Sequence, residues 1–493
     1  MECGWQARDD APLGTALTPT PTTESRAVSE AATIRRATLE RFFMTLGMYH
    51  RQKCADLAPK CDVNTLVYLE FGVLTGVPGY TLAGRIRAVA RLAVLSYHTS
   101  PLAQPGTGDG GGMNVYVREL SSALARLGHD VDVYTRRDNT QVRDMEFVEP
   151  GFRVHYVTAG PATPLDRDEL TEYVGEYTDS VKTLFRCSGT PDAIHANYWL
   201  SGLAGHRLKH ELDIPLIMTF HTLERVKADT FEAESDDRAF QEAAIVACAD
   251  AVLASCDVEA AQFVRLYNAE PSRVHVVPLG VEHAFFSPGY RPQARRALEL
   301  DQDAIMLLFV GRLQELKGAD LALETLIELR QRGHHAMLAI VGGPSGPDGK
   351  ATLEKLHRRV AEAGVIDQVT FVAPQAHQLL SSWMRAADVT LVPSRAESFG
   401  LVALESSACG TLVVASDVGG LSTLIEEGVN GYLVGERDVA LWADVVELAL
   451  DADTATALSN AAVLRARQYT WRRAGGSLAA LIDQLASESL VRC

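Results

Sequence analysis

Short apolar segments alternate with amphipathic segments along the chain from Leu92 onward, and this alternation limits the possible folds more than any other feature. Residues 92–97 form an apolar run typical of a buried strand, residues 113–127 have apolar side chains at helical spacing, and residues 131–134 form the next apolar run. This order predicts a βαβ unit in a parallel sheet. It recurs in two blocks joined near residues 278–288, so the sequence predicts an α/β protein with two doubly wound domains that face a cleft.

The first 90 residues do not share this alternation. Residues 12–23 are rich in Pro and Thr, which is typical of disorder, and residues 31–57 have helical spacing with no repeating pattern after them. We expect residues 1–90 to be a largely disordered N-terminal extension, or to result from a start that is placed too far upstream. Two Rossmann-like domains would follow, over 91–277 and 278–470. A C-terminal helix over 471–493 is expected to pack back on the N-terminal domain.

Charge and cysteine content exclude several classes of protein. The 493 residues include 46 Lys and Arg against 63 Asp and Glu, a net charge of −17, which argues against a nucleic-acid-binding protein. The eight cysteines contain no C-x2-C pair, so no zinc site of that type is predicted. Eight cysteines in 493 residues are also too few for a disulfide framework, so reduced thiols in a cytoplasmic protein are expected. The sequence shows no signal peptide and no stable membrane anchor.

A glycine-rich loop lies between the first predicted strand and its helix. Five of the seven residues from Gly106 to Gly112 are glycine, which lets a ligand approach the backbone closely at the helix N-terminus. Because such folds bind ligands at the carboxyl ends of their strands, we interpret residues 106–114 as a ligand loop. The alternative is a flexible turn.

Two pairs of charged residues follow strands of the second block. Arg312 and Lys317 come after the apolar run 305–310, and two cations at that edge would suit a diphosphate. Glu397 lies in a loop and Glu405 lies in the helix after it, so their carboxylates can accept hydrogen bonds from sugar hydroxyls. The alternative is that all four are solvated surface residues.

Two histidines end apolar strands of the first block. His98 follows the run 92–97, and His221 follows the run 216–220. A neutral imidazole at such a position can donate or accept a hydrogen bond near a reaction centre. The alternative is a structural histidine whose hydrogen bonds are satisfied within the fold.

Together these motifs resemble the GT-B fold, retaining glycosyltransferases of family 4. Glu397 and Glu405 are similar to that family's E-x7-E element, and Arg312 with Lys317 to its diphosphate clamp. Residues 98–114, 195–202, 342–347 and 398–402 are similar to the D-inositol-3-phosphate glycosyltransferases of mycothiol biosynthesis. The resemblance covers about residues 92–485. It implies transfer of N-acetylglucosamine from UDP-GlcNAc to 1D-myo-inositol 3-phosphate by a cytoplasmic homodimer without an organic cofactor.

The resemblance also implies roles for individual residues. The catalytic positions are His221, Arg312, Lys317 and Glu397. The donor positions are Gln104, Gly112, Arg312, Lys317, Gln375, Glu397 and Glu405. The acceptor positions are His98, Asp109, Gly110, Gly111, Gly112, Met113, Asn114, Arg167, Tyr198, Thr222 and Arg238. A structural Mg²⁺ would be held mostly by carbonyl groups at Met384, Arg385, Ala387 and Thr411.

Three positions depart from the family's pattern. Gln375 stands where the family usually has Arg, Arg167 where it commonly has Lys, and Asn197 replaces a His beside Tyr198. Three alternatives therefore stay open. They are a family 4 enzyme with another phosphorylated sugar or an aminocyclitol as acceptor, a GT-B UDP-sugar epimerase, and a catalytically silent nucleotide-sugar-binding protein.

Overall fold

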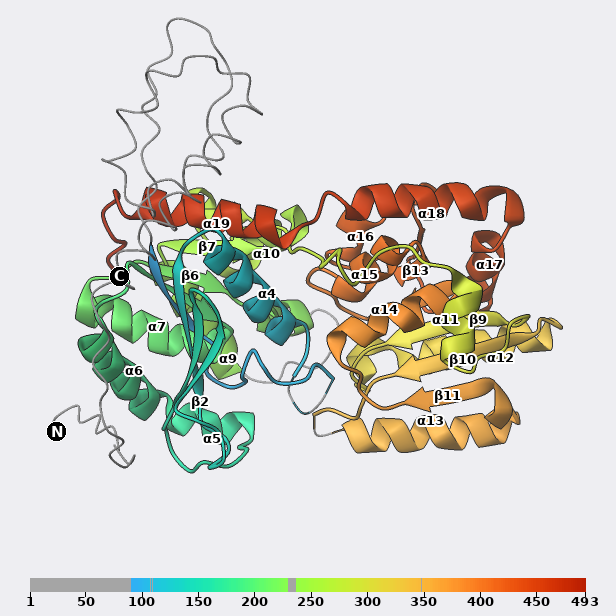
Figure 1. The fold of residues 1–493 in the computed structure, drawn as a ribbon, viewed down its shortest axis with the longest axis horizontal. Helices are drawn as coiled ribbons and strands as arrows, with labels where there is room; N and C mark the ends of the chain where they lie inside the picture. The colour runs from blue at the N-terminus through green and yellow to red at the C-terminus, as the bar shows by residue number, and fades with distance from the viewer. Residues whose placement is uncertain (1–89, 107, 109, 229–235, 347) are drawn as a thin grey trace, which may run out of the picture. The chain divides into compact units, whose positions relative to one another are not determined.

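The computed structural model describes residues 90–106, 108, 110–228, 236–346 and 348–493 (Figure 1). In these residues the apolar runs form the strands of two sheets. The predicted extension lies outside the described residues apart from residue 90. Within the described part, the first sheet has the order β3-β4-β2-β1-β5-β6-β7-β8. Its strands are β1 (Arg91–Leu95), β2 (Asp130–Arg136), β3 (Met145–Glu149), β4 (Phe152–Val157), β5 (Ala193–Asn197), β6 (Leu216–Thr219), β7 (Ala251–Ala254) and β8 (Val274–Val276).

All pairs in this first sheet are parallel except one. Strand β3 runs antiparallel to β4 at the edge of the sheet. The helices that connect the strands are α4 (Gly112–Arg126), α5 (Arg167–Glu172), α6 (Val174–Ser188), α7 (Trp199–Leu212), α8 (Glu224–Ala228), α9 (Asp236–Cys248) and α10 (Asp257–Tyr267).

The second sheet is parallel throughout, with the order β11-β10-β9-β12-β13-β14. Its strands are β9 (Ile305–Val310), β10 (Ala336–Val341), β11 (Val369–Val372), β12 (Val389–Val392), β13 (Leu412–Ser416) and β14 (Tyr432–Val434). Its helices are α11 (Arg291–Ala297), α12 (Ala319–Gln331), α13 (Gly349–Ala363), α14 (His377–Ala386), α15 (Leu401–Cys409), α16 (Leu421–Leu424), α17 (Val439–Ala449) and α18 (Ala452–Ala466).

Each sheet is covered on both faces, and the strand sequences explain why. In β9, Leu307 and Phe309 belong to one buried cluster, while Met306 and Leu308 belong to another on the opposite face. A strand buried on both faces needs apolar side chains at successive positions, which is why these strands appear as continuous apolar runs. The doubly wound arrangement predicted from the sequence is therefore confirmed for both domains.

The last helix returns to the first domain. Helix α19 (Trp471–Leu485) packs its apolar side chains, Trp471 and Leu478 among them, into the same buried cluster as residues of α4 and β1. Gly475 allows close approach to α4, since a Cβ there would lie 3.1 Å from the Ala123 Cβ. One face of the first sheet is thus completed by the C-terminal end of the chain (Figure 1).

Cysteine pairing differs from the expectation of reduced thiols. A disulfide joins Cys248, at the end of α9, to Cys493, and Cys187 is also disulfide-bonded. Cys256 and Cys409 are free and buried. The expectation was wrong because it used the spacing of cysteines along the chain, whereas Cys248 and Cys493 are 245 residues apart and meet only after folding. The helices that the structure describes are each too short or too polar to span a bilayer.

Candidate active site

A cleft with a volume of about 830 Å³ lies at the carboxyl ends of the strands of both sheets. Both sheets contribute residues to this cleft. Open α/β sheets bind ligands at this edge, where the strand order reverses. Its lining includes most of the positions named from the sequence: His98, Gly111, Gly112, Met113, Tyr198, His221, Thr222, Arg312, Lys317, Gln375, Glu397 and Glu405. Residues far apart in sequence therefore meet in one cleft.

The glycine-rich loop reaches the second domain. Gln104 Nε2 donates to the Pro374 carbonyl at 2.7 Å, and Ser345 Oγ donates to the Gly108 carbonyl at 2.7 Å. An added Cβ on Gly111 would lie 3.4 Å from Nε of Arg312. The loop thus lies beside a cation of the opposite sheet, as a loop that closes over an anionic ligand must.

Asn114 fixes the conformation of this loop. Its Oδ1 accepts from Gly111 N at 2.8 Å, and its Nδ2 donates to Thr99 Oγ1 and the Ser100 carbonyl. The side chain is buried, so in this structure its amide positions the loop rather than facing the cleft. Asp109 lies outside the described residues, and Gly110 accepts from Gly106 N within the loop.

Lys317 and Glu397 form an ion pair in the cleft. Lys317 Nζ lies 2.6 Å from Glu397 Oε2, and both side chains are partly exposed. Two glycines with positive φ pack closely beside this pair. A Cβ on Gly318 would lie 2.1 Å from the Pro393 carbonyl oxygen, and a Cβ on Gly419 would lie 1.9 Å from the Glu397 carbonyl oxygen, so only glycine fits at either position. The lysine thus faces a position where an anionic ligand would compete for it.

Glu405 has a partner that the sequence did not reveal. His377 Nε2 lies 2.6 Å from Glu405 Oε1, and Glu405 is buried. Burial alone would lower the pKa of His377, but the adjacent Glu405 carboxylate outweighs burial and raises it. The pair fixes one oxygen of Glu405 at the cleft wall.

The pair makes stability depend on pH. Because the pKa of His377 is raised above its ordinary value of 6.5, its stabilising contribution is full below that value and is lost as pH rises through the folded-state pKa. We expect His377→Gln to lower the free energy of unfolding by about 1.5–3 kcal/mol at about pH 6 and by less at about pH 8.5. Urea unfolding at both pH values measures this. The exposed His335→Gln serves as control, and an equal loss at both pH values would contradict the pairing.

The two histidines named from the sequence lie at the strand ends. His221 Nε2 lies 2.9 Å from Asn197 Oδ1, and His98 packs against Tyr198 with ring centroids 4.5 Å apart. Burial, with smaller effects of His195 and His98, lowers the pKa of His221 to about 3. His221 is therefore a neutral hydrogen-bonding group near neutral pH and a poor proton acceptor.

Backbone strain occurs at two cleft residues. Tyr198 has φ 75° and His221 has φ 64°, although neither is glycine. Non-glycine residues adopt such values at a cost of about 1–3 kcal/mol, and they do so most often at functional sites. Both residues follow the ends of strands, Tyr198 after β5 and His221 after β6, and both line the cleft.

Arg238, which the resemblance names as an acceptor position, is paired with carboxylates inside the fold. It is buried, with Nε 2.8 Å from Glu242 Oε1 and Nη1 3.2 Å from Glu224 Oε2. Nη2 also donates to the hydroxyl and carbonyl oxygens of Thr222 at 3.1 Å. Two buried carboxylates offset its charge, so in this structure Arg238 positions Thr222 at the cleft wall. Arg167 is the first residue of α5.

The residues expected to hold Mg²⁺ lie together but away from the cleft. Thr411 Oγ1 donates to the Met384 carbonyl at 2.5 Å, Ala387 follows the last turn of α14, and Arg385 donates to the Phe285 carbonyl. Carbonyl and hydroxyl oxygens are the hard donors that Mg²⁺ prefers, so the residues fit such an ion in kind. Such an ion would support the fold without reaching the cleft.

Sequence reasoning missed several cleft residues. Lys227, Glu259 and His377 line the cleft, and His377 pairs with Glu405. Asn197, named from the sequence only as a departure from the family's pattern, proves to hold His221 from behind the cleft lining. Burial raises the pKa of Glu259, whose Oε2 accepts from both Ser255 N and Oγ at 2.6 Å. Position at the start of α14 was the available signal for His377, whereas the pairings depend on tertiary contacts.

Comparisons with known proteins agree with this geometry. Residues 111–280 match the family "Glycosyl transferase 4-like domain", and residues 291–466 match "Glycosyl transferases group 1". D-inositol 3-phosphate glycosyltransferase of Actinosynnema mirum is 42% identical over 405 residues, covering 80% of this chain and 97% of that protein. The same enzyme of Mycolicibacterium smegmatis is 41% identical over 420 residues, covering 83% and 95%.

Solved structures share the fold. Sucrose-phosphate synthase of Thermosynechococcus elongatus is 32% identical with a TM-score of 0.74, over 80% of this chain and 99% of that one. Anabaena HepE in complex with UDP-glucose is 19% identical with a TM-score of 0.61, over 80% and 100%. The recognition of the family and the GT-B fold prediction are confirmed. The chain is a glycosyltransferase and belongs to the D-inositol 3-phosphate glycosyltransferase family.

Proposed function

We propose that this enzyme transfers N-acetylglucosamine from UDP-GlcNAc to 1D-myo-inositol 3-phosphate with retention of configuration, the first step of mycothiol biosynthesis. One observation carries the proposal. Lys317 and Glu397 form an ion pair in the same cleft as His221 and the glycine-rich loop, which come from the other sheet. A cation, a carboxylate and a neutral imidazole are thus available around one transferring sugar.

The second domain supplies the donor site. Arg312 and Lys317 would bind the diphosphate of UDP-GlcNAc, with Lys317 exchanging its contact with Glu397 for one with phosphate. Glu397 would then accept from the sugar hydroxyls, and Glu405, with one oxygen fixed by His377, would accept from the ribose. Gln375 and Gln104, both near Pro374, would lie beside the uracil.

The transfer step needs no protein nucleophile. The bond between the sugar's anomeric carbon and the phosphate oxygen breaks as a bond to the acceptor hydroxyl oxygen forms on the same face. The acceptor proton passes to the leaving phosphate oxygen. The charge that develops on UDP is stabilised by Arg312, Lys317 and the N–H groups at the start of α15, around Phe399–Leu401. His221, being neutral, orients the reactants.

The first domain supplies the acceptor site. His98, Tyr198, Thr222 and the loop residues Gly111–Met113 line the wall from which an inositol ring would approach. Lys227 lines the same cleft, and its positive charge would act on the acceptor phosphate together with that of Arg167, named from the sequence. Arg238, also named from the sequence, would act on the acceptor through Thr222.

Three further expectations belong to this proposal. The enzyme works in the cytoplasm, binds a structural Mg²⁺ at Met384 and Thr411, and forms a homodimer. The edge strand β3 supports dimer formation, because its Phe147 and Met145 side chains are 62% and 42% exposed. Light scattering after gel filtration measures the oligomeric state.

The proposal is tested with purified enzyme, UDP-GlcNAc and a set of acceptors read by mass spectrometry. The acceptors are 1D-myo-inositol 3-phosphate, unphosphorylated myo-inositol and glucose 6-phosphate. We expect a glycosylated product with the first, little with the second, and UDP release that matches product formation. NMR of the product gives its anomeric configuration.

Each other outcome identifies an alternative. Preferred glycosylation of glucose 6-phosphate would assign a different phosphorylated acceptor. Isomerised UDP-sugar in the absence of any acceptor would identify an epimerase. Binding of UDP-GlcNAc without turnover of any acceptor would identify a binding protein.

A further inference from the structure

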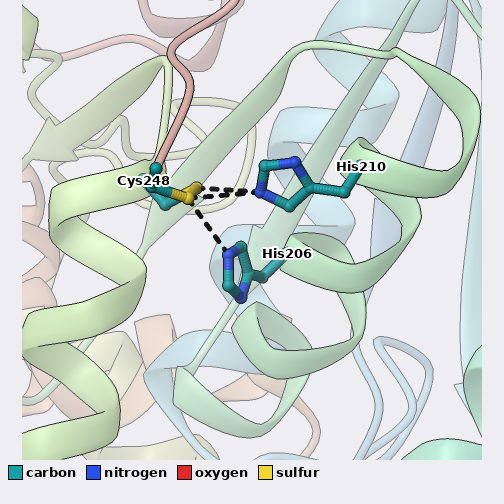
Figure 2. A group of neighbouring side chains, drawn as sticks. His206, His210 and Cys248 are labelled. Carbon is teal, nitrogen blue, oxygen red and sulfur yellow. Dashed lines mark hydrogen bonds between the residues drawn. A yellow bond between two sulfur atoms is a disulfide. The ribbon is translucent and has the colours of Figure 1, made fainter.

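Four metal-binding side chains converge outside the cleft, on the outer side of α7. His206 and His210 are one turn apart on that helix, Cys248 ends α9, and Cys493 is the last residue. Their ligand atoms all lie within 4.8 Å of one another. Figure 2 shows both imidazoles directed at the sulfur of the cysteine pair. None of the four residues lines the cleft.

The distances suit a tetrahedral ion. His210 Nε2 lies 3.1 Å from Cys248 Sγ and 3.2 Å from Cys493 Sγ, and His206 Nε2 lies 3.5 Å from Cys493 Sγ. Ideal Zn–N and Zn–S bonds in a tetrahedron place nitrogen and sulfur about 3.6 Å apart. The nitrogen–sulfur distances are already close to this value. Metal binding therefore requires mainly that the two sulfur atoms move apart once the bond between them is broken.

The segments that carry the sulfurs are held together without help from the bond between them. Buried Lys209 donates to the Cys248 carbonyl at 2.6 Å and to Asp250 Oδ1 at 2.9 Å. The same Asp250 oxygen accepts from Val491 N at 2.7 Å, two residues before Cys493. Reduction of the disulfide therefore leaves both thiols beside the two histidines.

A bound metal ion explains why two histidines lie beside the two cysteines better than a disulfide does. A disulfide sulfur is uncharged and a weak hydrogen-bond acceptor, so it gives two imidazoles little reason to converge. Two thiolates and two neutral imidazoles, by contrast, form the Cys₂His₂ donor set of structural zinc sites. The charge of Zn²⁺ would be balanced by the two thiolates.

We propose that the reduced chain binds one structural Zn²⁺ through His206 Nε2, His210 Nε2, Cys248 Sγ and Cys493 Sγ. Binding releases one proton from each thiol and transfers no electrons. From the disulfide form, two electrons from a phosphine or thiol reductant must first break the S–S bond. The ion joins the end of the chain to α7 and α9 of the first domain, and it is independent of the glycosyltransferase activity.

Cysteine spacing alone does not reveal this site. The H-x3-H pair His206 and His210 is a recognisable helical signal, since residues four apart share one face. The two cysteines meet it only through folding.

The test uses the full chain, reduced with a phosphine and freed of metal, then titrated with Zn²⁺ against a chromophoric chelator. We expect one tight equivalent for the wild type, with affinity at least about 100-fold weaker in His206→Ala and in Cys493→Ser. His335→Ala, an exposed histidine elsewhere, is the matched control and should match the wild type. Zn²⁺ should raise the Tm of the wild type but not of His206→Ala.

Peptide mapping without reductant separates the metal from the disulfide. The Cys248–Cys493 disulfide peptide should form in His206→Ala as in wild type, since that bond needs no histidine. Reduced wild type that binds no Zn²⁺ would overturn the proposal. So would Zn²⁺ that stays tightly bound after Cys493→Ser, a change of an exposed side chain whose folding circular dichroism checks.

Discussion

Lys317→Ala is expected to lower kcat/KM for sugar transfer by about 10²–10³-fold, equivalent to about 3–4 kcal/mol of transition-state stabilisation. The lysine lies in the cleft 2.6 Å from Glu397 and on the loop after β9, where the charge of the leaving UDP would develop. Its loss also leaves the Glu397 carboxylate without its partner, next to an incoming anion. Both effects raise the barrier to bond cleavage.

Steady-state kinetics with UDP-GlcNAc measure this effect, read as UDP release. Lys350→Ala is the matched control, because Lys350 is an exposed lysine of α13 outside the cleft lining, and it should retain full activity. Circular dichroism establishes that both variants fold. Folded Lys317→Ala with unchanged turnover would rule out the assigned diphosphate contact.

Arg238→Ala is expected to lower the free energy of unfolding by about 3–5 kcal/mol. The guanidinium lies between Glu242 and Glu224, both almost fully buried, and its removal leaves two carboxylates without their cation. Breaking a buried pair costs far more than removing a surface charge. Thr222 would also lose its hydrogen bonds at the cleft wall.

Urea unfolding followed by circular dichroism measures this loss. Arg296→Ala, an exposed arginine on α11, should change stability by less than about 0.5 kcal/mol. Arg238→Lys should restore part of the stability because it keeps the positive charge. If Arg238→Ala is as stable as the wild type but loses only phosphorylated acceptors, Arg238 contacts the acceptor phosphate directly.

The sequence predicted those elements whose apolar pattern follows directly from the fold. Strands buried on both faces are continuous apolar runs, so β1, β6 and β9 were predicted to within a few residues. The edge hairpin β3–β4 was not predicted, because side chains of β3 such as Phe147 are exposed and the apolar run is absent. Its position depends on pairing with β2 rather than on its own sequence.

The site was predicted residue by residue but not contact by contact. Spacing and resemblance named Lys317, Glu397 and Glu405, and the structure places all three in one cleft. Their pairings with one another and with His377 join residues 80 and 28 positions apart, which no local pattern reveals. Arg238 shows the converse, since its i,i+4 spacing from Glu242 was visible in the sequence and its burial was not.

The return of α19 to the first domain has a consequence for biosynthesis. As the chain leaves the ribosome, β1 to β8 emerge while the helix that covers one face of their sheet, Trp471–Leu485, is still untranslated. The second domain lies between them in the chain and contains its own buried clusters, whose last member is Tyr469, so its core is complete before α19 is made. The usual order of co-translational folding is therefore reversed: the half that is made first is the half that finishes last.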